Sequence, residues 1–138
     1  MKILIDTNII LDVLLQRKDF YDDSKKVLEK CENKEILGYV SVNTITDLYY
    51  LIHKSLHDTR KTYTALAAIL DIVKVLTVTN EDVLNAFLKQ KTDFEDCLLE
   101  TVAISNKLDA IITRNKKDFQ KDLINVYDAN EFLKISGK

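Results

Sequence analysis

Short apolar runs alternate along this chain with segments whose apolar residues recur at helical spacing, and this alternation narrows the folds it can adopt. Ile3 to Ile5 form a run that is apolar at every position, as in a strand buried on both faces. Further strands are expected at residues 37–42, 74–78, 109–113 and 123–127. Helices are expected over residues 8–15, 20–32, 42–56, 59–73 and 92–108, and from Thr79 and Asp128 onward. This order predicts an α/β fold, a three-layer α/β/α sandwich with a central parallel sheet of about five strands.

The length and composition predict one globular domain. The chain has 138 residues, so we expect a single domain over residues 1–138. It contains no proline and two glycines, which leaves no material for a long flexible linker and favours helices. The formal net charge is −2, so any contact with nucleic acid must be local and cannot rest on a generally basic surface.

Three features lead us to expect a cytoplasmic protein with no membrane partner. Cys31 and Cys97 fall within helical patterns, and two isolated cysteines are expected to be reduced thiols of the core. No apolar stretch reaches the roughly 20 residues of a membrane span. Asp6 and Asp12 interrupt the apolar N-terminal stretch, which argues against a secretory signal peptide.

Three polar residues, Asp6, Thr7 and Asn8, separate the first expected strand from the first expected helix. Each is a good helix N-cap, so capping accounts for one polar residue here. Capping does not require the negative charge of Asp6. In open α/β sheets ligands bind at the carboxyl ends of the strands, which is where Asp6 is expected to lie.

Further acidic and amide side chains fall at the same expected edge of the sheet. They are Asp47 near the start of the helix after the second strand, Asp93 and Asp96 in the first turn of the helix before the fourth strand, and Asn115 and Asp118 after that strand. Each also has a structural interpretation, as a helix cap, a first-turn acid or a turn residue. Their convergence from separate segments favours a site.

Carboxylates that converge in this way repel one another unless a cation neutralises them. Mg²⁺ prefers carboxylate and water oxygens. One or two such ions can activate water and stabilise the oxyanions of phosphodiester cleavage. The acidic set therefore predicts a divalent-metal site.

The segments IDTNIILDVL, SVNTITDLYYLI, DFEDCLLETVAI and IITRNKKDF resemble, in this order and spacing, the PIN domain family. The resemblance extends from Met1 to about Phe132. It implies an α/β/α sandwich and an endoribonuclease that depends on Mg²⁺ or Mn²⁺ and leaves 5′-phosphate and 3′-hydroxyl ends. Many small bacterial members are toxins of VapBC-type toxin–antitoxin pairs, so the resemblance also implies RNA as substrate and an antitoxin protein as partner.

Position by position, the resemblance makes Asp6, Asp96 and Asp47 metal ligands. It places Asn115 among the catalytic residues, where many members have a fourth aspartate, and Asp47 where most have glutamate. Asp47 is one methylene shorter than glutamate and Asn115 is neutral, which leaves open whether one or two ions bind. The supporting residues are expected to be Asn8, Asp93, Thr113 and Asp118.

A local basic cluster surrounds Asn115. It comprises Arg114, Lys116, Lys117 and Lys121. A phosphate backbone that enters the acidic site would meet these cations, so Arg114, Lys116 and Lys117 are candidate RNA-binding residues.

Two other groups have a structural and a functional interpretation. Tyr49, Tyr50 and Tyr63 can stack on bases, although helix packing is favoured. His53 and His57 have a spacing that zinc ligands use, but the segment lacks the glutamate of an HExxH motif and a third ligand is not evident.

The resemblance and the small sandwich architecture also predict a homodimer. The candidate interface is the apolar faces of the helices over 42–56 and 59–73, which carry Leu48, Tyr49, Ile52, Leu66 and Ile69.

Two alternatives to a ribonuclease stay open at this point. One is an aspartate-based phosphatase with Asp6 as nucleophile, although Asn8 stands where such enzymes often have a second acid. The other is a catalytically weak or degenerate module that binds RNA or protein, which the neutral Asn115 favours and the retained Asp6 and Asp96 disfavour.

Overall fold

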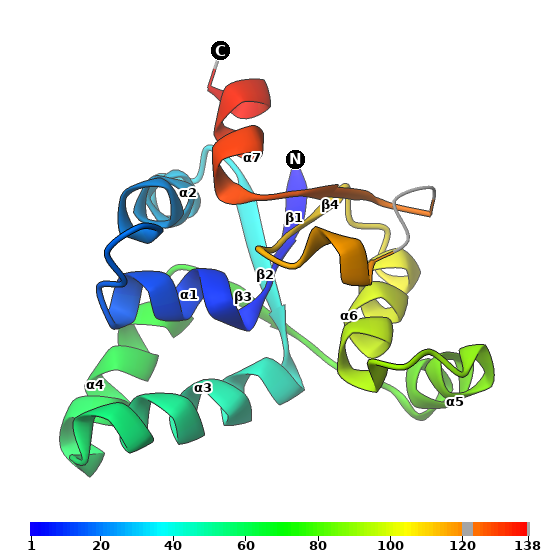
Figure 1. The fold of residues 1–138 in the computed structure, drawn as a ribbon, viewed down its shortest axis with the longest axis horizontal. Helices are drawn as coiled ribbons and strands as arrows, with labels where there is room; N and C mark the ends of the chain where they lie inside the picture. Colours follow the sequence, from blue (N-terminus) through cyan, green and yellow to red (C-terminus); the bar gives the residue numbers. More distant parts are fainter. Residues whose placement is uncertain (120–122, 138) are drawn as a thin grey trace.

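Five strands form one sheet at the centre of the fold, and every neighbouring pair of strands is parallel. The computed structural model describes residues 1–119 and 123–137. Lys121 of the expected basic cluster lies outside these residues. The strands are β1 (Lys2–Ile5), β2 (Leu37–Ser41), β3 (Lys74–Leu76), β4 (Ala110–Ile112) and β5 (Asn125–Tyr127). Their order in the sheet is β3-β2-β1-β4-β5 (Figure 1).

Helices cover both faces of the sheet. They are α1 (Thr7–Leu14), α2 (Tyr21–Glu32), α3 (Val42–Leu56), α4 (Thr59–Leu70), α5 (Asn80–Lys89), α6 (Phe94–Ser105) and α7 (Ala129–Ser136), with a short 3-10 helix η1 (Lys116–Asp118). In the described residues none of these helices is long and apolar enough to cross a membrane. The predicted three-layer α/β/α sandwich with a five-stranded parallel sheet is confirmed.

The side chains of β1 explain its central place. Ile3 and Ile5 point to one face of the sheet and Leu4 points to the other, and all three are fully buried. Ala110 and Ile112 of β4 join the first face. A strand that is apolar at every position is stable only between two covered faces, so the prediction that β1 and β4 lie inside the sheet is confirmed.

The two faces carry separate parts of the core. Residues of α1, α2, α3, α4 and α7 pack on the Ile3 face, with Phe132 of α7 among the largest fully buried side chains. Leu99 and Ala103 of α6 pack on the Leu4 face, and α5 packs against α6 through Ala86. Figure 1 shows α5 and α6 on one side of the sheet and the remaining helices on the other.

The structure overturns the interface residues that the sequence predicted. Leu48, Ile52, Leu66 and Ile69 are at most 7% exposed, because α3 and α4 pack on each other and turn their apolar faces into the core. These residues are therefore unavailable to a partner. The large apolar side chains that α3 and α4 expose are instead Val42, Tyr50, Leu51, Leu56, Tyr63 and Leu70.

Both cysteines are free and buried, as the sequence predicted. Cys31 of α2 packs over β2 at Gly38, where only glycine fits. A Cβ atom at Gly38 would lie 2.7 Å from the Sγ atom of Cys31 and 3.1 Å from Cδ1 of Ile5. The missing side chain thus lets α2 approach the sheet closely.

We predict that Gly38→Ala lowers the free energy of unfolding by about 1–3 kcal/mol, the usual effect of an added methyl group in a packed core. Cys31→Ala removes the closest atom, so the double variant should lose less stability than the sum of the single variants, as measured by urea unfolding. The matched control is Cys97→Ala, because Cys97 is buried in a different part of the core and should combine additively with Gly38→Ala. Additive behaviour of the Cys31 pair would contradict the contact.

Candidate functional site

The order of strands reverses at β1, and the candidate site lies at this point. The chain leaves β1 for α1 and returns in β2 on one side, while β4 pairs on the other side. Ile5 is in register with Ile112, and the backbone N–H of Asp6 donates to the Ile112 carbonyl at 3.0 Å. The residues that follow β1 and β4 therefore emerge side by side, in the position where open α/β sheets bind ligands.

Asp6 is held in a fixed orientation at the end of β1. Its side chain caps α1 by accepting from the Thr7 backbone N–H at 2.8 Å, and its other oxygen accepts from the Thr113 hydroxyl at 2.7 Å. The residue is 6% exposed. Burial raises the pKa of Asp6, although the hydrogen bonds from Thr113 and Thr7 act in the opposite direction. The Asp6 carboxylate thus caps α1 and also belongs to the candidate site.

Thr113 connects Asp6 to the segment after β4. Because its hydroxyl hydrogen points to Asp6, its oxygen is free to accept, and the Asn115 backbone N–H donates to it at 3.1 Å. Thr113 is fully buried. The supporting position expected from the sequence is thus one that fixes both the Asp6 carboxylate and the Asn115 backbone.

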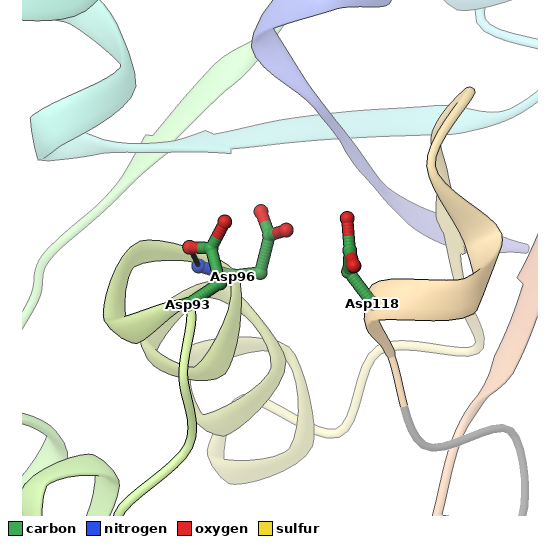
Figure 2. A group of neighbouring side chains, drawn as sticks. All are labelled: Asp93, Asp96 and Asp118. Carbon is green, nitrogen blue, oxygen red and sulfur yellow. Dashed lines mark hydrogen bonds between the residues drawn. The ribbon is translucent and has the colours of Figure 1, made fainter.

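The first turn of α6 brings two more carboxylates to this edge. Asp93 caps α6 by accepting from the Asp96 backbone N–H at 3.0 Å, and Asp96 is partly buried behind it. Asp118, at the end of η1, approaches from the opposite side. Carboxylate oxygens of Asp93, Asp96 and Asp118 lie within 4.8 Å of one another, and Figure 2 shows Asp96 between the other two.

Asp47 projects into the site from the middle of α3. The helix begins at Val42 and its first turn contains no acid, so the interpretation of Asp47 as a first-turn acid is wrong. Its carboxyl group faces Glu95 of α6, with which it forms a hydrogen bond.

Glu95 is a site residue that sequence reasoning missed. Glu95 lies about 100° around the helix from Asp96, so helical spacing does not place the two side chains on one face. At the first turn of a helix that points into a pocket, neighbouring faces both reach it. The signal in the sequence was the string DFED, in which Glu95 directly precedes Asp96 and three of four residues are acidic.

These side chains line one pocket of about 430 Å³. Its lining residues are Asp6, Thr7, Asn8, Asp47, Tyr50, Leu51, Asp93, Glu95, Asp96 and Asn115. Thr113 contacts the pocket through Asp6, and Asp118 borders it through Asp93 and Asp96. The acidic and amide residues singled out from the sequence are therefore brought together.

The pocket is electrostatically strained in the absence of a cation. Desolvation, and then repulsion from Asp6, Asp93, Asp118 and Glu95, raises the pKa of Asp96 to about 7. Desolvation and the nearby Asp47 raise the pKa of Glu95 to about 6. Both shifts arise first from desolvation of the carboxyl groups and then from repulsion among neighbouring carboxylates.

The donor set fits a hard divalent cation. Carboxylate oxygens are the ligands that Mg²⁺ and Mn²⁺ prefer. A cation would offset the repulsion that adds to desolvation in raising these pKa values. The wall of the pocket also contains the Thr7 hydroxyl, a buried oxygen with no hydrogen-bond partner among the described residues. Among the described residues, Asp93, Asp96 and Asp118 have carboxylate oxygens close enough together to hold such an ion. Asp6, Asp47 and Glu95 line the same pocket.

The basic residues around Asn115 differ in what they contact. The Arg114 guanidinium pairs with Asp12 at 3.2 Å, and the Lys116 amine pairs with Glu131 at 2.6 Å. Lys117 is exposed and, with Asp118, borders a second pocket of about 410 Å³.

The tyrosines also separate. Tyr49 stacks on His53 with ring centroids 5.7 Å apart and contacts Tyr63 at 5.4 Å, so these rings pack α3 against α4. His53 also lies 3.3 Å from the Thr59 hydroxyl. Tyr50, which is 72% exposed, instead stands at the rim of the acidic pocket.

Comparisons with known proteins agree with this geometry. A family model described as the PIN domain matches residues 2–117. No curated protein sequence matches the chain.

Solved structures share the fold. The chain is similar to DNA-bound VapBC from Salmonella typhimurium, with 17% identity and a TM-score of 0.72, over 94% of this chain and 98% of that one. VapBC-1 from nontypeable Haemophilus influenzae has 21% identity and a TM-score of 0.69, over 94% of this chain and 99% of that one. Mycobacterium tuberculosis VapC20, described as a Sarcin-Ricin loop cleaving toxin, has 16% identity and a TM-score of 0.64, over 88% and 92%. At these identities the likeness establishes the fold.

We predict that the metal-free protein loses stability as the pH rises from about 4 to 7. The folded pKa of Asp96, about 7, exceeds its ordinary value of 3.8, so the folded state binds this proton more tightly than the unfolded state. The stabilisation is complete below the unfolded pKa and disappears as the pH passes the folded pKa.

The measurement is urea unfolding in EDTA across this pH range, in wild type and in Asp96→Asn. The variant should show a flatter dependence, whereas Glu29→Gln on the exposed face of α2 should follow wild type. Parallel pH profiles of Asp96→Asn and wild type would contradict the raised pKa of Asp96.

Proposed function

The chain belongs to the PIN domain family, and on that premise we propose that it is a divalent-metal-dependent endoribonuclease, the toxin of a type II toxin–antitoxin pair. The observation that carries the proposal is the acidic pocket. Separate segments of the chain contribute carboxylates to it, and those of Asp96 and Glu95 have raised pKa values. A site that serves only the fold has no reason to concentrate charge in this way.

Asp6, Asp96 and Asp47 are the proposed metal ligands, and the ion is Mg²⁺ or Mn²⁺. When bound, it would supply an activated water and positive charge for the oxygens of a phosphodiester. Asp6 is oriented for this role by Thr113 and by the first backbone N–H of α1. Asn115 adds a neutral donor and acceptor at the same wall of the pocket.

Glu95 compensates, in our proposal, for the short side chain of Asp47. The two carboxyl groups are in contact, and Glu95 has the additional methylene that Asp47 lacks. Asp118 has a similar relation to Asn115: its carboxylate lies close to Asp93 and Asp96 and adds the charge that Asn115 does not carry. A second ion, where one binds, would use this side of Asp96.

The proposed partners are RNA, an antitoxin protein and a second copy of the chain. Fold relatives from Salmonella typhimurium and Haemophilus influenzae are VapBC proteins, which supports the antitoxin. Lys117 and Tyr50, both exposed beside the acidic residues, are candidates for contacts with RNA phosphate and base. Co-purification with the product of a neighbouring reading frame tests the antitoxin.

The phosphatase alternative is disfavoured by the surroundings of Asp6. Aspartate-based phosphatases often have a second acid two residues after the nucleophile, and here that position is Asn8, which lines the pocket beside Asp6. Cleavage of single-stranded RNA and of a generic phosphomonoester, each with Mg²⁺ and with EDTA, separates the two enzymes from the non-catalytic binding module.

We predict that Asp6→Asn abolishes metal-dependent RNA cleavage and leaves the protein folded. Asparagine keeps the size of the side chain and can still cap α1, but it lacks the charge that attracts Mg²⁺. Without metal the variant should be as stable as wild type or slightly more so, because repulsion with Asp96 is relieved.

Cleavage assays and thermal melts, each with Mg²⁺ and with EDTA, measure both effects. Wild type should gain stability with the ion and the variant should gain less. Asp118→Asn is the comparison variant and should reduce cleavage to a smaller extent. Full activity in Asp6→Asn, or in wild type with EDTA, would reject the metal-nuclease proposal.

The role of Glu95 gives a separate prediction. Glu95→Gln should weaken Mn²⁺ binding roughly 10-fold or more, the usual effect of removing a group that supports metal ligands. Adding Asp47→Glu to that variant should recover affinity, because glutamate supplies the missing reach. Isothermal titration with Mn²⁺ measures both, and a Glu95→Gln variant with wild-type affinity would remove Glu95 from the site.

A further inference from the structure

The segment after β4, residues 113–118, divides its side chains between two directions. Thr113, Asn115 and Asp118 face the acidic pocket or its edge. The cations between them, Arg114 and Lys116, pair with acids of α1 and α7. Two of the three basic residues that the sequence placed on the RNA path, Arg114 and Lys116, therefore pair with acids of the protein, whereas Lys117 is exposed.

Arg114 pairs with Asp12, the most deeply buried acid among the residues that the structure describes. The side chain of Asp12 is 0% exposed, and its Oδ1 atom lies 3.2 Å from Nη2 of Arg114. The guanidinium also lies over the ring of Phe20, 4.0 Å from its centroid. The Ser24 hydroxyl donates to the second Asp12 oxygen at 3.2 Å. Nη1 of Arg17 lies 3.6 Å from the same Asp12 oxygen, so two guanidinium groups flank this carboxylate and Arg114 is the nearer one. A buried carboxylate without a cation is strongly unfavourable, which favours these pairings in the folded state.

Lys116 is anchored to the start of α7. Its Nζ atom lies 2.6 Å from Oε1 of Glu131 and 3.5 Å from Oδ2 of Asp128. These two acids form the capping box of α7, and α7 is fixed to the core by the fully buried Phe132. The second anchor is thus attached to a rigid element, as is the first.

Asn115 lies between the two anchors. Its backbone N–H donates to Thr113, which in turn donates to Asp6, and its carbonyl accepts from the Asp118 N–H at 3.1 Å. Fixing the residues on both sides of Asn115 fixes these bonds, and through them the direction of the Asp6 and Asp118 carboxylates. The ion pairs on the outside of the segment thereby determine the geometry on its inside.

We propose that Arg114 and Lys116 are positioning residues that hold Thr113, Asn115 and Asp118 against the metal pocket, in place of the RNA contacts expected from the sequence. The inference rests on the proposed function, because it treats the pocket as a metal site. A cation that binds RNA phosphate adds to the salt dependence of RNA affinity, and a positioning cation does not. The two roles are therefore separable.

The experiment compares Arg114→Gln with Lys117→Gln, a change at the exposed lysine of the same segment. Isothermal titration with Mn²⁺ gives metal affinity, and a fluorescein-labelled single-stranded RNA in EDTA, at several salt concentrations, gives the slope of RNA affinity. Hydrogen exchange at the Asn115 backbone amide reports how firmly residues 113–118 are held when neither metal nor RNA is bound.

We expect Arg114→Gln to weaken Mn²⁺ binding about 10- to 100-fold, the range for groups that orient metal ligands, and to speed exchange at Asn115. The dependence of its RNA affinity on salt concentration should match that of wild type. Lys117→Gln should keep wild-type Mn²⁺ affinity and exchange. The inference is overturned if Arg114→Gln keeps its Mn²⁺ affinity and exchange, or if its main effect is a salt slope lower by about one.

A double-mutant comparison adds a second criterion. If Asp12 and Arg114 act as a unit, Asp12→Asn, Arg114→Gln and their combination should lose Mn²⁺ affinity to the same extent. Losses that add would contradict a shared role. Should a single variant fail to fold, Asp12→Leu with Arg114→Met replaces the pair by apolar side chains that a core tolerates. Wild-type affinity in that folded double variant would overturn the inference.

Failure of the proposed function gives a different result. If wild type binds no Mn²⁺, the metal-nuclease proposal fails, and exchange at Asn115 still decides whether Arg114 fixes the segment. If wild type binds Mn²⁺ and cleaves RNA while Arg114→Gln behaves as Lys117→Gln does, only the positioning role fails.

Discussion

Repulsion among carboxylates is the constraint on which the arrangement of this protein's candidate site depends. Parallel pairing of β1 with β4 places Asp6 beside the segment after β4, and the start of α6 brings Asp96 to the same place. Each of these positions is also stabilised locally: Asp6 and Asp93 are N-caps of their helices. The helices are thus built so that their favourable first turns offset part of the unfavourable charge.

The fold was predictable because its signals are local and repeated. Ile3 to Ile5 and Ala110 to Ile112 are apolar at every position, which requires burial on both sides and so places these strands inside the sheet. Asp58, Thr79 and Asp128 cap the helices that follow them, so the beginnings of those helices were marked in the sequence. Parallel connections then brought the acidic residues to one edge.

The remaining features depend on distances that a sequence does not contain. Glu95 could not be assigned to the pocket, because its place depends on the angle at which α6 approaches α3. Arg114 looked like an exposed cation until the structure placed Asp12 beneath it at 3.2 Å. Leu48 and Ile52 belong to the core and not to an interface, and the sequence does not distinguish the two, because an apolar helical face has the same pattern whether a neighbouring helix or a partner covers it.

The close contact of Cys31 with Gly38 has a consequence for the chemistry of the thiol. Oxidation begins from the thiolate and adds an oxygen atom to sulfur. Burial raises the pKa of Cys31 to about 12, so the thiolate is scarce, and the Sγ atom lies 2.7 Å from the place of a Gly38 Cβ, so the added oxygen has no room on that side. Cys31 is therefore protected from peroxide and alkylating reagents in the folded state, and its labelling reports opening of the α2–β2 contact.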